Sequence, residues 1–104
     1  MASYRFTLDA TEDLDDIWWF IAKDNPEAAD RVEQEILTAC EGLARWPLQG
    51  HVRPDLTKRP VRFWTVPRYS NYIIVYRPET QPLQIVRVLH GKRNLRRILR
   101  QQEL

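Results

Sequence analysis

Two stretches in the first half of the chain repeat apolar residues with the spacing of a helix. In the first stretch the apolar face consists of Leu14, Ile17, Trp18 and Ile21. Asp9 and Thr11 can cap the start of this helix, and Pro26 ends it because proline disfavours helical geometry in the preceding residue. The pattern predicts an amphipathic helix over roughly residues 9–24. Its charged residues, expected elsewhere on the helix surface, are Asp13, Asp15, Asp16 and Lys23.

A second apolar stripe follows at once. Asn25 is a suitable N-cap, and Pro26 occupies the first helical position, where proline is tolerated. The stripe consists of Ala29, Val32, Ile36, Ala39, Cys40 and Leu43. It continues to about Trp46, and Pro47 ends it. Helices of about 15 and 20 residues joined by about two residues must fold back antiparallel, which predicts a helical hairpin.

The second half of the chain has the composition of loops and strands. Four of the seven prolines lie in residues 47–67, which predicts a loop with short extended pieces. Strand-like runs follow at residues 61–66, 72–77 and 84–90, and a shorter alternating run lies at residues 3–7. The last two runs are rich in β-branched and aromatic residues and have a short proline-containing connection, so we expect them to form an antiparallel hairpin.

The chain is expected to end in a short basic helix. Gly91 breaks the last strand, Asn94 can cap a helix, and its apolar positions are Leu95, Ile98 and Leu99. The element order is then β-α-α-β-β-β-α. We expect an α+β fold in which the helical hairpin packs on a small antiparallel sheet. Residues 1–104 contain no internal repeat, low-complexity segment or domain boundary, so we expect a single domain.

Alternation along the last strand predicts a cluster of cations. Val86 and Val88 should share one face, and Arg87 should lie on the other. If the hairpin covers the valine face, Arg87 lies on the opposite, concave face of the sheet. Its expected neighbours are Arg62, Arg68, Lys92 and Arg93, with His90 at the strand end. Cations gathered there must either form internal salt bridges or bind an anionic partner.

The distribution of charge favours the anionic partner. Residues 1–50 contain four basic and eleven acidic side chains, a net charge of −7, whereas residues 51–104 contain twelve basic and three acidic side chains, a net charge of +9. Ten of those twelve are arginine, whose planar guanidinium suits bidentate contacts to carboxylate or phosphate. A basic half is typical of a protein that binds an acidic partner, although the same charges could merely solvate a small domain.

Composition narrows the class of protein further. A chain that is 43% hydrophobic and 29% charged is typical of a globular domain. The single cysteine, Cys40, lies in an apolar stripe and is expected in the core rather than as a reactive thiol. No leader-like segment or apolar run of about 20 residues occurs, so we expect a cytoplasmic protein without membrane contact. The sequence shows no metal-ligand spacing or phosphate-binding glycine loop, and we expect neither metal nor cofactor.

A ribonuclease site would be incomplete in this sequence. Cleavage of RNA by its own 2′-hydroxyl needs a base, an acid and cations for the added phosphate charge. Arg87, His90 and Arg93 could supply the acid and the cations. The candidate carboxylates lie in predicted loops, and no tyrosine follows Tyr76. A single histidine at a strand end is more often structural than catalytic.

Three segments resemble a known family. They are residues 50–56 (GHVRPDL), 72–77 (YIIVYR) and 87–94 (RVLHGKRN), and they resemble the ParE branch of the ParE/RelE toxins in order and spacing. The resemblance extends over nearly the whole chain. Members of this superfamily are toxins of type II toxin–antitoxin modules, including plasmid-stabilisation systems. Their compact fold packs a helical hairpin on an antiparallel sheet, so the resemblance implies the same fold class as the residue pattern.

The resemblance implies one of two activities. RelE-like members cut messenger RNA on the ribosome, often with a C-terminal tyrosine, whereas ParE-like members poison DNA gyrase. Arg87 matches the arginine of the last strand, and His90 falls where some ribosome-dependent relatives have a histidine. This chain has no counterpart of the C-terminal tyrosine, and no lysine cluster precedes its sheet. Its long helical hairpin resembles that of ParE. We expect a gyrase poison that arrests growth; a metal-independent endoribonuclease using Arg87, His90 and Arg93 is the alternative, and an inactive toxin stays open.

The resemblance also implies a partner. Antitoxins of this family join a DNA-binding domain to a disordered, acidic, amphipathic tail that wraps the toxin. We expect such a tail to order against the basic sheet and terminal helix, in a toxin–antitoxin hetero-oligomer. Direct binding of nucleic acid stays open. The expected contact residues for antitoxin or target are Arg62, Arg68, Arg87, His90, Lys92, Arg93 and Arg97.

Overall fold

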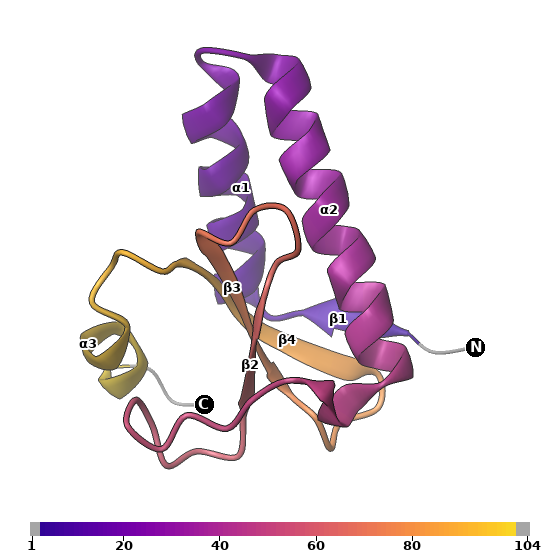
Figure 1. Cartoon of the computed structure of the whole chain (residues 1–104), viewed down its shortest axis with the longest axis vertical. Helices are drawn as coiled ribbons and strands as arrows, with labels where there is room; N and C mark the ends of the chain where they lie inside the picture. The colour runs from indigo at the N-terminus through magenta and orange to yellow at the C-terminus, as the bar shows by residue number, and fades with distance from the viewer. Residues whose placement is uncertain (1–2, 102–104) are drawn as a thin grey trace.

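The computed structural model describes residues 3–101 and shows a helical hairpin, a sheet and a short third helix (Figure 1). The helices are α1 (Leu8–Ala22), α2 (Pro26–Arg45) and α3 (Leu95–Arg100), with a 3₁₀ turn η1 at Pro47–Gln49. The strands are β1 (Tyr4–Phe6), β2 (Arg62–Thr65), β3 (Tyr72–Arg77) and β4 (Leu83–His90). This order confirms the predicted α+β fold. None of the helices in residues 3–101 has the length and apolar character that a membrane span requires.

The sheet has four strands in the order β1-β4-β3-β2. The pairs β2–β3 and β3–β4 are antiparallel, as expected, whereas β1 lies parallel to β4. The sheet is therefore mixed, with β1 at the edge beside β4 and β2, the strand that follows the helical hairpin, at the opposite edge. The short β1 pairs only with Leu83–Ile85, so the rest of the β4 edge is left for α1 to cover.

The start of α1 is tied to this edge. Thr7 is the N-cap, and its hydroxyl accepts a hydrogen bond from the backbone N–H of Ala10 at 3.1 Å. The same hydroxyl donates to the backbone carbonyl of Val86 at 2.8 Å. The helix therefore begins before Asp9, which sequence spacing indicated as a cap. The predicted cap of α2 is confirmed, since Asn25 accepts from the N–H of Ala28.

Two apolar cores lie on the two faces of the sheet. The hairpin-side core contains Ala10, Val32, Ile36, Cys40, Leu43, Val66, Ile74, Tyr76, Leu83, Ile85 and Val88. The α3-side core contains Val61, Phe63, Val75, Val86, Leu89 and Leu99. Leu95 and Ile98 pack against this second core, so the apolar face of the terminal helix seals it.

A β-bulge interrupts the regular alternation of side chains that the sequence predicted for β4. Val75 pairs with Arg87 but the next residue, Tyr76, pairs with Ile85, which leaves Val86 as an extra residue in β4. Val86 consequently belongs to the α3-side core and Val88 to the hairpin-side core. The prediction that the two valines share one face is wrong, because a bulge shifts the period of two by one residue.

The Cys40 thiol lies in the hairpin-side core, as predicted. It is fully buried, and burial raises its pKa to about 12. A thiol reagent at about pH 8 should therefore react with native protein only as fast as the fold opens, and rapidly in denaturant. Fast reaction of the native protein would contradict this placement. Since the folded pKa exceeds the unfolded one, the neutral thiol favours the fold at low pH, and this contribution is lost as the pH rises towards about 12.

Candidate functional site

Arg87 is held by an aspartate of the helical hairpin. Its Nε and Nη2 atoms donate to the two carboxylate oxygens of Asp13 in α1, at 2.6 and 2.8 Å. The backbone N–H of Val88 donates to the same carboxylate at 3.0 Å. Asp13 is only 8% exposed, and its hydrogen bonds raise the pKa of the Arg87 guanidinium.

The sequence left two alternatives for Arg87, an internal salt bridge or a contact with an anionic partner, and this ion pair decides between them. Arg87 leaves β4 on the face of its partner Val75, which is the α3 side, and its guanidinium reaches Asp13 on α1. The cation is therefore paired internally. Asp13, expected on the outer surface of α1, is instead buried. Its spacing from Ala10 and Ile17, at i+3 and i−4, places it on the inner face of the helix.

Arg62 and Arg68 do not join Arg87. Arg62 pairs with Tyr76, whose side chain belongs to the hairpin-side core, and its Nη1 donates to the carbonyls of Gly50 at 2.9 Å and Leu48 at 3.3 Å. Arg68 lies 3.8 Å from the carboxylate of Glu35 in α2 and is largely exposed. The prediction that these arginines surround Arg87 is wrong, because both turn towards the hairpin side.

His90 and Lys92 lie at the end of β4. The Nδ1 atom of His90 accepts a hydrogen bond from the backbone N–H of Lys92 at 3.1 Å. The imidazole packs edge-on against Tyr72, with ring centroids 5.4 Å apart. These contacts give His90 a local role in shaping the turn that follows the strand. Lys92 is exposed.

Arg93 lies in the turn before α3, and Arg97 lies within the helix; both are exposed. One hollow of about 350 Å³ is lined by Arg93, Asn94, Arg97, Ile98 and Gln101. A neighbouring hollow of about 320 Å³ is lined by Asp9, Arg87, Arg93, Ile98 and Gln101. Of the predicted residues, the structure thus brings Arg87, Arg93 and Arg97 to adjoining places, with Arg87 already bound to Asp13.

Sequence reasoning missed part of the basic surface. A groove of about 480 Å³ runs between the loop at residues 54–59 and α3, lined by Pro54, Asp55, Leu56, Thr57, Lys58, Arg59, Arg96, Leu99 and Arg100. The carboxylate that Asp55 contributes to this groove forms an ion pair with Arg53, whose Nη2 lies 2.8 Å from Oδ2 of Asp55. The sequence contained a signal for this surface, because Arg96 and Arg100 are four residues apart and outside the apolar positions of the helix, and so share an exposed side. We call Arg93, Arg96, Arg97 and Arg100 the α3 basic face.

A buried tyrosine fixes the loop that carries the first family-like segment. The hydroxyl of Tyr76 donates to the carbonyl of Pro47 at 2.6 Å and accepts from the N–H of Gly50 at 2.9 Å. Burial raises the pKa of Tyr76. His51 and Phe63 then exchange two backbone hydrogen bonds of 2.8 Å, which join the loop to the edge of β2.

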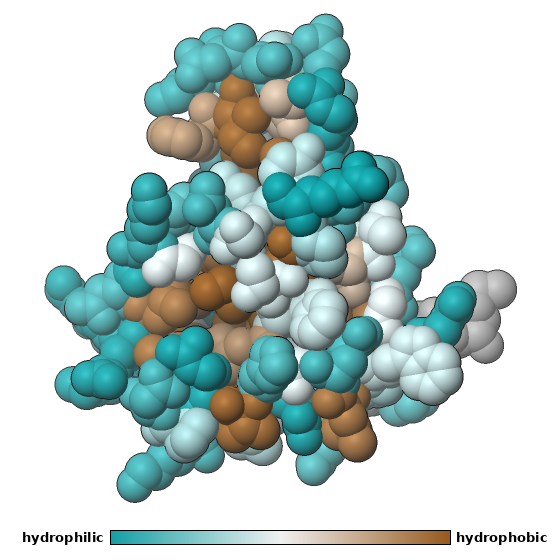
Figure 2. Space-filling view, in the orientation of Figure 1, coloured by the Kyte–Doolittle hydropathy of each residue, from teal (hydrophilic) through white to brown (hydrophobic). Residues whose placement is uncertain are grey.

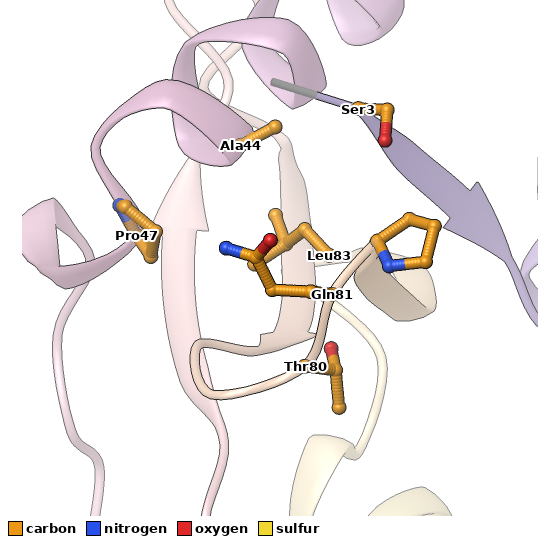
Figure 3. A pocket seen from close by; sticks show the side chains of 7 residues that line it. Ser3, Ala44, Pro47, Thr80, Gln81 and Leu83 are labelled. Atoms are coloured by element: carbon orange, nitrogen blue, oxygen red, sulfur yellow. The ribbon is translucent and has the colours of Figure 1, made fainter. Parts of the chain in front are cut away.

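Below this loop, α2 and the β3–β4 turn enclose a pocket of about 320 Å³ (Figure 3). Its walls are formed by Ser3, Ala44, Pro47, Thr80, Gln81, Pro82 and Leu83. None of these side chains is ionisable, so the pocket offers no acid, base or charge to a partner. Among residues 3–101, no group of three histidine, cysteine or carboxylate side chains is placed to hold a metal ion.

Comparisons with known proteins agree with this architecture. Residues 4–95 match the family described as the ParE toxin of type II toxin–antitoxin systems. The proposed toxin Y4kP of Sinorhizobium fredii is 35% identical over 95 residues, which are 91% of this chain and 94% of that protein. A solved structure of the chromosomal ParDE toxin–antitoxin system from P. aeruginosa superposes with a TM-score of 0.70 at 29% identity, covering 88% of this chain and 98% of that one. The chain therefore belongs to the ParE family of type II toxin–antitoxin toxins.

Proposed function

We propose that this toxin arrests growth by poisoning DNA gyrase and that a cognate antitoxin neutralises it. The observation that carries the proposal is the engagement of Arg87, which is tied to Asp13 within a ParE-type fold. A ribonuclease would need that guanidinium for phosphate charge. The similar P. aeruginosa structure is that of a ParDE toxin–antitoxin system, which supports an antitoxin partner here.

The ribonuclease alternative is less well supported by the arrangement of the remaining candidates. His90 accepts a backbone hydrogen bond through Nδ1 and packs on Tyr72, while Arg93 lies beyond the strand near α3. A phosphodiester would need an acid, a base and cations converging on one phosphate. Binding of a protein target needs a complementary surface, and this chain exposes arginines around α3 and aromatic side chains such as Trp19.

The order in which macromolecular synthesis stops would separate the two activities. We expect that induction of the toxin in antitoxin-free cells lowers incorporation of labelled thymidine before incorporation of labelled methionine. A gyrase poison blocks replication first, since broken DNA stops the forks, whereas cleavage of messenger RNA stops translation first. An initial fall in methionine incorporation would overturn the proposal in favour of the ribonuclease.

We assign the antitoxin to the α3 basic face and the groove beside it. An acidic, amphipathic tail would place carboxylates against the arginines and apolar side chains in the groove beside Leu56 and Leu99. Of the contact residues expected from the sequence, Arg93 and Arg97 lie on this face and Lys92 directly precedes Arg93, whereas His90 pairs with Tyr72 on the hairpin side. Arg62 and Arg68 lie on the hairpin side and are outside this surface.

Reversal of two charges on this face should weaken the complex. We expect Arg93→Glu with Arg97→Glu to raise the dissociation constant by roughly tenfold to a hundredfold, because both exposed cations would become repulsive. The measurement is titration calorimetry with purified antitoxin at several salt concentrations. The matched control is Arg31→Glu with Arg45→Glu on the exposed surface of α2. A native dissociation constant that stays constant from about 50 to about 500 mM salt would contradict the electrostatic account.

A further inference from the structure

The outer face of α1 exposes two adjacent aromatic side chains that the fold does not use. Trp19 is 70% and Phe20 67% exposed. Both residues lie near the C-terminal end of α1, and the end of the hairpin where α1 meets α2 projects past the sheet (Figure 1). Figure 2 shows hydrophobic surface at this end of the hairpin, bordered by hydrophilic side chains. Exposed apolar groups of this size, grouped and bordered by polar residues, are typical of an interaction site.

The two rings are held in place before any partner arrives. Trp18 donates from Nε1 to the carboxylate of Asp30 in α2 at 2.9 Å. Trp19 packs edge-to-face on Trp18 with ring centroids 5.1 Å apart. The Nζ atom of Lys23 lies 4.6 Å from the ring centre of Phe20. Rings fixed in this way lose little conformational entropy on binding, which is the property of an interface anchor.

Carboxylates occupy the same face of the helix. Glu12, Asp15 and Asp16 are exposed and precede Trp19 at helical spacings of seven, four and three residues. An acidic surface repels the acidic tail expected of an antitoxin. It also disfavours a symmetric dimer through this face, since each acidic surface would meet its own copy. The partner that complements this face in charge is therefore a protein with a basic surface, in which an apolar recess accepts the two rings.

We infer that the acidic aromatic face of α1, with Trp19 and Phe20 as anchors, docks onto a basic surface of the toxin's protein target. This inference rests on the proposed function, because it assigns the target-binding surface of that toxin. Target and antitoxin then contact surfaces of opposite charge, and an antitoxin bound at α3 neutralises the toxin by steric exclusion of the target rather than by covering the aromatic anchors.

The test compares exposed aromatic residues at two places. Trp19→Ser with Phe20→Ser should raise the toxin dose that arrests growth at least about tenfold. The control is Trp46→Ser, which removes a tryptophan of similar exposure, 66%, outside the hairpin face. Thermal unfolding and antitoxin affinity should match the wild type for both. A second variant, Asp15→Lys with Asp16→Lys, leaves the rings in place and should weaken target binding most at low salt.

Each outcome bears on the inference separately from the proposed function. Growth arrest by the Trp19/Phe20 variant at the wild-type dose would overturn the inference. A wild-type dimer in sedimentation experiments that the variant dissociates would also overturn it, in favour of a second copy on this face. Wild-type protein that arrests growth without trapping gyrase would reject the gyrase target alone. The growth-arrest comparison would then still decide whether this face binds the target.

Discussion

Replacement of Asp13 by alanine is expected to destabilise the protein by about 3–5 kcal/mol. The carboxylate binds the Arg87 guanidinium through two hydrogen bonds and also accepts the N–H of Val88. Its removal leaves a half-buried cation and a backbone donor without this partner where α1 meets β4. Urea denaturation at neutral pH measures the loss of unfolding free energy.

Two further variants separate the ion pair from a general effect of the helix. Asp15→Ala changes an exposed carboxylate on the same helix and should alter stability by no more than about 0.5 kcal/mol. The double variant Asp13→Leu with Arg87→Met removes both charges and should recover much of the loss, since it also removes the cation that Asp13→Ala deprives of this carboxylate. A loss below about 1 kcal/mol for Asp13→Ala would show that the pair does not hold α1 on β4.

Gly50→Ala is expected to cost about 2–4 kcal/mol. The backbone of Gly50 is extended, with φ of −74°, so the difficulty is space rather than conformation. An added Cβ would overlap the Tyr76 hydroxyl and lie 3.0 Å from the carbonyl oxygen of Phe63. Tyr76 is fully buried and cannot move aside, so its hydrogen bonds to Pro47 and Gly50 would be lost.

Gly42→Ala provides the matched control for this change. The nearest atom to its added Cβ is Nε2 of Gln49 at 3.8 Å, which is an ordinary contact. Gly42 lies inside α2, where alanine is favoured over glycine by about 0.5–1 kcal/mol. We expect Gly42→Ala to be neutral or stabilising in thermal unfolding. Equal stability of the two variants would contradict the close packing of the loop at residues 47–51.

The elements could be predicted because their signals are local. Helical spacing, the Asn25 cap and Pro26 define the hairpin within α1 and α2, and β-branched runs define β3 and β4. The parallel position of β1 could not be derived from residues 3–7, because nothing in a three-residue strand selects its neighbour.

The site was harder to predict because one extra residue changes its geometry. A prediction from simple alternation along β4 could not include the bulge at Val86. A count of charges could not show that Asp13 lies on the inner face of α1, against β4. The excess of arginine therefore suggested a cluster around Arg87 that the structure replaces with an internal ion pair. Arg87→Glu would bring two carboxylates together and test stability rather than antitoxin binding.

The most direct measurement is a gyrase cleavage assay with purified antitoxin-free protein, supercoiled plasmid and ATP. Trapping of the covalent gyrase–DNA intermediate should yield linear plasmid after treatment with detergent and protease, and addition of antitoxin beforehand should prevent it. The contrary result would be unimpaired supercoiling without linear DNA, from a preparation that arrests growth in cells. That result would reject gyrase as the target.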